Sequence, residues 1–198
     1  MSTFDDLMGH VLNPNRNTDS HLMTMFGIAV GIKAKNILEL GVQHGNTSTP
    51  LAFAAQLNQG KLTSVDIMPE VQYGVRTYTP PSHAAPYREF VEMDAIEFLE
   101  NEAKKGTMYD LVYVDDWHSY PHVKRELELL DQMTTPKSII LLHDLMAHTY
   151  PRYNFFEGDK HEFADGGPTK AVFELDKDKW EWATIPVSEG LTILRKTK

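Results

Sequence analysis

The sequence contains no cysteine among its 198 residues. It therefore has neither disulfides nor a thiolate metal site, which fits a cytoplasmic protein. Long apolar runs are also absent, since no stretch approaches the roughly 20 residues that a membrane-spanning helix needs. The segment 1–17 is polar and acidic, unlike a secretory signal. We expect a cytoplasmic protein that has no membrane partner.

Positive charge is scarce as well. Lys and Arg number 19 against 28 Asp and Glu, the formal net charge is −9, and no basic cluster stands out. Sequence-independent binding of nucleic acid needs a positive surface, so we expect no nucleic-acid partner. The length favours one domain, residues 1–198, with one sizeable core. The oligomeric state stays open, and a homo-oligomer is one of the alternatives.

Strand and helix patterns alternate along the chain. Apolar residues at helical spacing predict two helices near the N-terminus, at 4–12 and about 20–34, which would form a helical cover (1–35) over the sheet. Strands are predicted at 37–40, 62–66, 90–93, 111–115 and 139–142, and a helix at about 168–177 precedes a hairpin of 180–186 and 191–195. This alternation predicts an α/β fold, a Rossmann-like three-layer sandwich with a mostly parallel seven-stranded sheet and a C-terminal antiparallel hairpin.

The segment 36–48 is the most informative part of the sequence. It predicts a buried strand with Glu39 near its end, then a G-x-x-x-G turn starting at Gly41, then a helix capped by Ser48 or Thr49. Glycines in such a turn let the backbone approach a ligand closely. The turn has neither the G-x-G-x-x-G of dinucleotide sites nor the Gly-Lys-Ser/Thr of triphosphate loops. An acidic residue before the turn favours a cationic ligand such as S-adenosylmethionine (SAM).

Acidic residues end three later strands, in order: Asp66, Asp94 (followed by Ala95) and Asp115. With the glycine turn, they make the chain resemble the class I SAM-dependent methyltransferases. Within these it looks like the small metal-dependent O-methyltransferases, both the catechol O-methyltransferase type and the types of cephalosporin and macrolide biosynthesis. The resemblance runs from about residue 36 to the C-terminus and implies one SAM-dependent methyltransferase domain.

The resemblance implies a cofactor site along these strand ends. The methionine part of SAM would be held by Glu39, Gly41, Gly45 and Thr47. Asp66 would accept hydrogen bonds from the ribose hydroxyls, Asp94 and Ala95 would lie beside the adenine, and Asp115 would border the cofactor. Two simpler alternatives stay open: Asp66 as a solvated strand end, and Asp94 as a plain helix cap.

Two strand ends, 114–120 and 142–144, are dense with potential metal ligands. The resemblance implies a divalent ion, Mg²⁺ or Mn²⁺, held by Asp115, His143 and Asp144. Histidine at 143 departs from the catechol type. It would shift the preference toward Mn²⁺, Fe²⁺ or Zn²⁺, or it would orient Asp144. The simpler alternative is a hydrogen-bonded pair, His143 with Asp144, that closes a strand.

Methyl transfer to a hydroxyl needs a base, because a neutral hydroxyl is a poor nucleophile. His118 is the candidate base, three residues after Asp115, where the catechol-type enzymes carry a catalytic lysine. Its alternatives are a histidine that binds substrate or one that caps the next helix. Asp116 is expected to cap a helix or to support the site. Trp117 would pack on adenine, on substrate, or in the core.

The segment 146–167 is rich in aromatic residues and histidines. It would form a substrate lid, or else pack on the domain's own surface or on a second subunit. The function predicted is a metal-assisted O-methyltransferase acting on a hydroxyl of a small molecule or a sugar. The alternatives are a SAM-binding enzyme of another type, either a metal-independent transferase or a SAM-degrading enzyme, and a nicotinamide oxidoreductase, which the missing G-x-G-x-x-G disfavours.

Overall fold

Seven strands form one sheet in the part of the chain that the structure describes. The structure is a computed structural model that describes residues 3–12, 19–69, 83–146, 163 and 166–198. The strands are β1 (Asn36–Leu40), β2 (Lys61–Asp66), β3 (Arg88–Glu92), β4 (Leu111–Val114), β5 (Ile139–Leu142), β6 (Trp180–Ile185) and β7 (Leu191–Lys196). β1 to β5 run parallel, whereas β7 runs antiparallel to both β5 and β6. The predicted mostly parallel sheet with a closing hairpin is confirmed.

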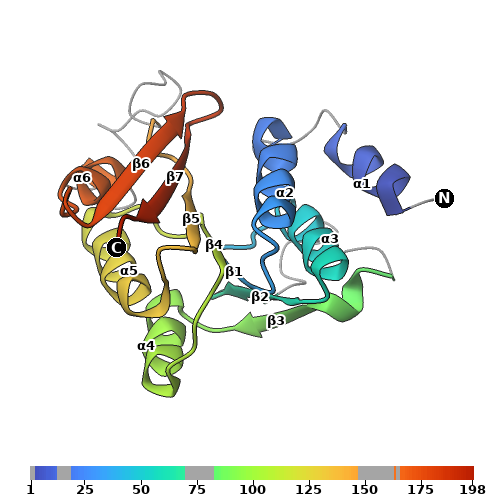
Figure 1. Cartoon of the computed structure of the whole chain (residues 1–198), viewed down its shortest axis with the longest axis horizontal. Helices are drawn as coiled ribbons and strands as arrows, with labels where there is room; N and C mark the ends of the chain where they lie inside the picture. Colours follow the sequence, from blue (N-terminus) through green and yellow to red (C-terminus); the bar gives the residue numbers. More distant parts are fainter. Residues whose placement is uncertain (1–2, 13–18, 70–82, 147–162, 164–165) are drawn as a thin grey trace.

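Helices cover both faces of this sheet (Figure 1). One face carries α1 (Thr3–Val11), α2 (Leu22–Gly31) and α3 (Ser48–Asn58), and the other carries α4 (Ala95–Lys105), α5 (Tyr120–Met133) and α6 (Gly167–Phe173). Short 3₁₀ turns lie at Asp19–His21 and Ala85–Tyr87. A separate hydrophobic cluster fills each interface, as expected for a three-layer sandwich. Among the helices described, none has the length and apolar character needed to cross a membrane.

The order of the strands in the sheet reverses beside β1. The order across the sheet is β3-β2-β1-β4-β5-β7-β6, so the chain first moves outward from β1 and then returns to β4 on its other side. In open α/β sheets, ligands bind outside the carboxyl ends of the strands at such a reversal. Leu40 pairs with Val114. The segments that follow β1 and β4 therefore leave the sheet side by side.

The start of α3 differs from the sequence prediction. Thr47 is the N-cap residue, rather than Ser48 or Thr49, and its side chain makes no capping hydrogen bond. The reason is a stronger acceptor nearby: the hydroxyls of Thr47 and Ser48 both donate to the Glu39 carboxylate.

Two helices end earlier than predicted. α2 stops at Gly31 because Lys33 takes a left-handed conformation, with φ of 57°, which cannot continue a helix. α6 stops at Phe173 because Asp176 starts a turn, in which its carbonyl accepts from the amides of Lys179 and Trp180.

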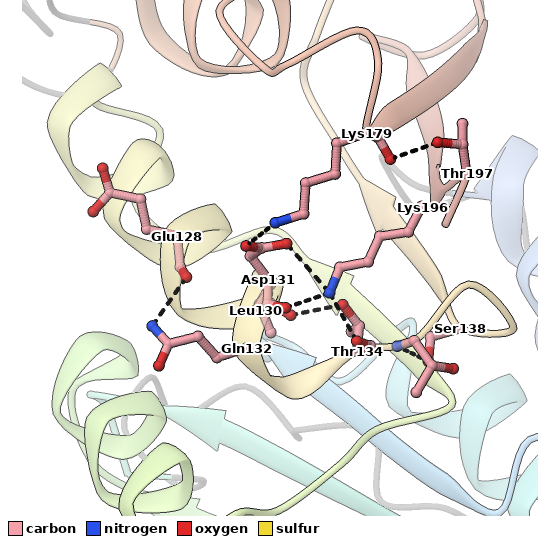
Figure 2. A network of polar contacts seen from close by, with 10 residues as sticks. Glu128, Leu130, Asp131, Gln132, Thr134, Ser138, Lys179, Lys196 and Thr197 are labelled. Carbon is pink, nitrogen blue, oxygen red and sulfur yellow. Dashed lines mark hydrogen bonds and ion pairs between the residues drawn. The ribbon is translucent and has the colours of Figure 1, made fainter.

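A buried lysine fastens the last strand to the end of α5 (Figure 2). Lys196 is 8% exposed. Its Nζ donates to the carbonyl oxygens of Asp131 and Thr134, the latter at 2.8 Å, and lies 3.2 Å from the Asp131 carboxylate. The C-terminal end of a helix carries partial negative charge. The ammonium group therefore satisfies carbonyls that the helix itself leaves unpaired.

Lys196→Met is expected to lower the free energy of unfolding by about 1–3 kcal/mol, because it leaves buried carbonyl groups without a donor. Lys179→Met is the matched control. Lys179 pairs with the same Asp131 at 2.5 Å, but its side chain is 44% exposed, so its loss should cost only about 0–1 kcal/mol. Urea denaturation of both variants measures the difference, and equal losses would contradict the role given to Lys196.

Candidate active site

Gly41 brings the turn after β1 against the backbone after β4. Its φ is 84°, in the region that favours glycine. A Cβ at this position would lie 2.1 Å from the carbonyl oxygen of Asp115 and 2.8 Å from the Cα of Asp116. No side chain fits there. The close approach therefore holds together the two segments that leave the sheet after β1 and β4.

Glu39 lies under this turn and is fully buried. Its carboxylate accepts hydrogen bonds from the hydroxyls of Thr47, Ser48 and Ser64. Burial raises the pKa of Glu39, and the charge of Arg88 and these hydroxyls oppose the rise. Three donors on one carboxylate join β1, β2 and the start of α3. The contact predicted between Glu39 and a ligand stays a prediction.

Asp66, at the end of β2, organises the same turn. Its Oδ2 accepts from the backbone amides of Val42 at 2.8 Å and Gln43 at 2.9 Å, and its Oδ1 accepts from Met68 N at 2.8 Å. A carboxylate offers about four acceptor positions. One position on Oδ1 therefore remains for a ligand hydroxyl while the turn stays in place.

Asp94 is the N-cap of α4, and its Oδ1 accepts from the amide of Glu97 at 3.1 Å. The capping role considered for Asp94 is thus confirmed. Ala95, the first residue of α4, is buried. A place beside the adenine of a cofactor stays a prediction for both residues.

Two carboxylates and two imidazoles meet beyond β4 and β5. His118 Nε2 lies 2.8 Å from Asp144 Oδ2 and 3.3 Å from Asp115 Oδ1. His143 Nδ1 lies 3.2 Å from Asp144 Oδ2 and 3.5 Å from Asp115 Oδ1. The group thus brings two carboxylates and two imidazoles into contact in a largely buried place.

Electrostatics in this cluster favour ionised carboxylates. Burial acts against ionisation, but the neighbouring His143 and His118 hold the pKa of Asp115 well below its usual range. Burial also lowers the pKa of His143, and the charges of Asp115 and Asp144 outweigh this and raise it to about 10. A protonated His143 would counter the charge of both carboxylates, and a metal ion that binds His143 would have to displace its proton.

Two further features hold the cluster in shape. The buried Tyr113 donates its hydroxyl hydrogen to Asp115 Oδ2 at 2.7 Å. Asp144 has a φ of 64°, a conformation that costs energy outside glycine and that often accompanies functional sites.

The sequence matches the family model described as a methyltransferase domain over residues 38–145, more than half of the chain. The match includes the glycine turn and all four members of the cluster. The chain belongs to this methyltransferase family. No curated protein matches it significantly. The prediction of a methyltransferase is confirmed.

Solved structures share the fold of this methyltransferase. A proposed O-methyltransferase from Klebsiella pneumoniae is 14% identical with a TM-score of 0.70, covering 99% of this chain and 88% of that one. TomG, an O-methyltransferase of tomaymycin synthesis from Streptomyces achromogenes in complex with SAM, is 16% identical with a TM-score of 0.66, covering 91% and 81%. The MycE methyltransferase of the mycinamycin pathway, in complex with Mg, SAH and mycinamycin VI, is 15% identical with a TM-score of 0.62, covering 98% and 53%. At these identities the likeness establishes the fold.

In this methyltransferase the three predicted metal ligands, Asp115, His143 and Asp144, do lie together, and His118 joins them. Ligand atoms of Asp115, His118 and Asp144 lie within 4.8 Å of one another, so these three residues form a potential ligand set. His118 is thus a potential metal ligand as well as the candidate base. The sequence could not separate these two roles.

The structure also tests the roles predicted for Asp116 and Trp117. Asp116 does not cap α5, whose N-cap is Ser119; instead its Oδ2 lies 2.9 Å from His122 Nε2. Trp117 is 46% exposed, so core packing was the wrong alternative for it.

Sequence reasoning missed Tyr113 and His21. Tyr113 was hidden inside an apolar strand pattern. The fully buried His21 packs edge-on against the His143 ring at 5.6 Å and lies 2.8 Å from the Val187 carbonyl through Nε2. Only the fold brings these distant residues together, and no local signal marked them.

Most of the predicted lid, 146–167, lies outside the described residues. Of its described members, Phe163 stacks on the His118 ring at 5.0 Å with an interplanar angle of 4°. Gly167 is close enough that a Cβ would lie 2.9 Å from the His118 carbonyl oxygen. This end of the segment therefore contacts the candidate base, while the lid itself stays a prediction.

Proposed function

We propose that this protein is a SAM-dependent O-methyltransferase, assisted by a divalent metal, that acts on a hydroxyl of a small molecule or a sugar. Residues 1–198 would form one methyltransferase domain. The observation that carries the proposal is the polar cluster of Asp115, His118, His143 and Asp144 beside the glycine turn of a methyltransferase fold.

The residues of the cluster fit a divalent ion. Ligand atoms of Asp115, His118 and Asp144 lie within 4.8 Å of one another. Nε2 of the 4%-exposed His143 is buried and makes no hydrogen bond to any described residue, whereas its Nδ1 faces the carboxylates of Asp115 and Asp144. Carboxylate oxygens suit Mg²⁺ and Mn²⁺, and the imidazoles tip the preference toward Mn²⁺. A bound ion would lower the pKa of a substrate hydroxyl.

The protein's own groups would then handle the proton. Bound SAM would supply the methyl group: a substrate hydroxyl oxygen would attack its methyl carbon, the electron pair of the broken carbon–sulfur bond would stay on sulfur, and the hydroxyl proton would pass to His118. The stacked Phe163 limits the rotation of the His118 ring, and Asp144 orients its Nε2. A positioned base of this kind contributes to catalysis by meeting the proton in the right geometry.

The cofactor residues are assigned along the crevice. Gly41, Gly45 and Thr47 would border the methionine part of SAM, with Glu39 holding the turn beneath them, and Asp66 would bind the ribose. Asp94 and Ala95 at the start of α4 would lie beside the adenine, and Asp115 would separate cofactor from metal. TomG with SAM and MycE with SAH and Mg support this placement by fold alone.

Asp66→Ala is expected to weaken SAM binding by about 1.5–3 kcal/mol, the scale of a charge-assisted hydrogen bond. Asp110→Ala is the matched control. Asp110 Oδ2 likewise accepts from two consecutive amides, Lys35 N at 2.8 Å and Asn36 N at 2.9 Å, but at the amino end of the parallel strands. Calorimetric titration of SAM should separate the two variants, and equal SAM affinities would reject the ribose assignment.

Two alternative functions predict a different result when SAM and metal are titrated into the protein. A metal-independent transferase or a SAM-degrading enzyme would bind SAM without a metal site in the cluster. Family membership leaves the nicotinamide oxidoreductase without support. Titrating SAM into metal-stripped protein, with and without Mn²⁺, tests the proposal directly. SAM binding with separate Mn²⁺ binding supports it, whereas an absence of SAM binding would show that the glycine turn serves another ligand.

A further inference from the structure

A second group of metal-ligating side chains lies between the loop after β4 and α5. It consists of Asp116, His122 and Glu126, whose ligand atoms lie within 4.8 Å of one another. His122 and Glu126 are four residues apart on α5, so they project from the same helix face. His122 Nε2 lies 2.9 Å from Asp116 Oδ2 and 3.8 Å from Glu126 Oε1.

Glu126 is the unusual member. It is 0% exposed, and neither of its carboxylate oxygens accepts a hydrogen bond from any residue that the structure describes. Buried carboxylates are otherwise paired, hydrogen-bonded or bound to a metal. Oδ1 of Asp116 is buried and lacks a hydrogen bond to the described residues as well. The Asp116 and Glu126 carboxyl groups thus lie together beside the His122 imidazole, and they need either a shared proton or a shared cation.

We propose that Asp116, His122 and Glu126 form a second divalent-metal site, selective for an ion that accepts both oxygen and nitrogen ligands, such as Mn²⁺ or Zn²⁺. One imidazole with two carboxylates is a donor set that these ions take readily. Mg²⁺ binds less well there, because it prefers oxygen ligands and keeps most of its water. The site shares no side chain with the cluster of Asp115, His118, His143 and Asp144.

The electrostatics agree with the geometry. Burial, followed by the nearby Asp116 carboxylate, raises the pKa of Glu126 well above its usual range. A buried pair of like charges is costly, and a divalent ion would offset both charges at once. The competing occupant is a proton shared between Asp116 and Glu126.

An ion in this site would stiffen the proposed active site. Asp116 follows Asp115 directly, and the loop of Asp116 leads into His118. Joining Asp116 to the first two turns of α5 would hold this loop against the helix, much as supporting contacts orient the ligands of other metal sites. The second ion would thus be a structural ion, and it does not depend on the proposed reaction.

Equilibrium dialysis of the metal-stripped protein against Mn²⁺ alone, and separately against Zn²⁺ alone, tests the inference. The wild-type chain should bind about two equivalents of at least one of these ions. Glu126→Gln, which keeps the side-chain shape, and His122→Asn should each bind about one equivalent fewer. Glu128→Gln is the control, since Glu128 is an exposed carboxylate on the same helix.

Asp144→Asn separates the two sites, because asparagine tolerates the positive φ at this position. Loss of one equivalent in Asp144→Asn and of the other in Glu126→Gln supports two sites. A single equivalent that survives Glu126→Gln and disappears in Asp144→Asn overturns the second site and leaves the first. A single equivalent that survives Asp144→Asn and disappears in Glu126→Gln supports the second site and removes the metal from the proposed reaction. No binding of either ion overturns both.

Discussion

Replacing Asp115 with asparagine is expected to reduce methyl transfer at least about a thousandfold and to abolish its dependence on added metal. Asp115 is the only member of the polar cluster that, among the described contacts, also receives the Tyr113 hydroxyl, and its Oδ1 faces both His118 and His143. Loss of its charge removes a potential metal ligand and takes away the negative charge that faces the imidazoles of His118 and His143. Metal-ion catalysis supplies several kcal/mol, and each 1.4 kcal/mol is about a factor of ten.

The measurement is SAM turnover against Mn²⁺ concentration for the wild type and the variant. Glu92→Gln serves as the control, since Glu92 is an exposed carboxylate at the same edge of the sheet, at the end of β3. SAM affinity, measured in parallel, shows whether the crevice is intact. Full metal-stimulated turnover in Asp115→Asn, with the control also active, would show that the metal assignment is wrong.

Much of the fold could be predicted because its strands are marked locally. Residues 111–114 and 139–142 are short apolar runs, as expected of parallel strands buried on both faces. Their carboxyl ends had to meet at one edge, so Asp115, His143 and Asp144 could be grouped without knowing any distance. In the structure, Leu40 at the end of β1 pairs with Val114 at the end of β4, and this pairing places the glycine turn beside these residues.

The helix start at Thr47 could not be predicted from local pattern alone. Hydroxyls near a helix start usually cap it. Here Thr47 and Ser48 instead donate to Glu39, eight and nine positions earlier, and Ser64 reaches the same carboxylate from β2. The buried Glu39 carboxylate, which the fold brings close, is a better acceptor for these hydroxyls than the capping geometry offers. Helix-capping preferences describe only neighbouring residues in the sequence and take no account of such a distant partner.

Buried polar residues on regular elements were the other blind spot. Glu126 lies in a helix whose sequence alternates charged and apolar residues, so nothing local distinguishes it from the exposed Glu128 two positions on. His21 likewise looks like any polar residue before a helix. Their burial is a property of how α5 and α2 pack, and that packing becomes visible only when the elements are assembled.

His118→Gln is expected to lower turnover by about 10²–10⁴-fold while leaving SAM affinity and metal stoichiometry unchanged, if His118 serves as the general base. Glutamine retains a group that can donate a hydrogen bond to Asp144, so the variant tests proton transfer more than packing. The experiment is needed because His118 Nε2 lies 2.8 Å from Asp144 and 3.3 Å from Asp115, so His118 could bind a metal ion together with these carboxylates as well as act as a base.

Metal binding decides between these roles. If turnover falls in His118→Gln and Mn²⁺ affinity is unchanged, the imidazole acts on the proton, and His143 completes the ligand set with Asp115 and Asp144. If Mn²⁺ affinity and turnover fall together, His118 is a ligand, and the base must be sought elsewhere in the crevice. His83→Asn is the matched histidine control for turnover, because His83 packs on Phe53 and lies outside both clusters. Undiminished turnover in His118→Gln would remove His118 from the mechanism altogether.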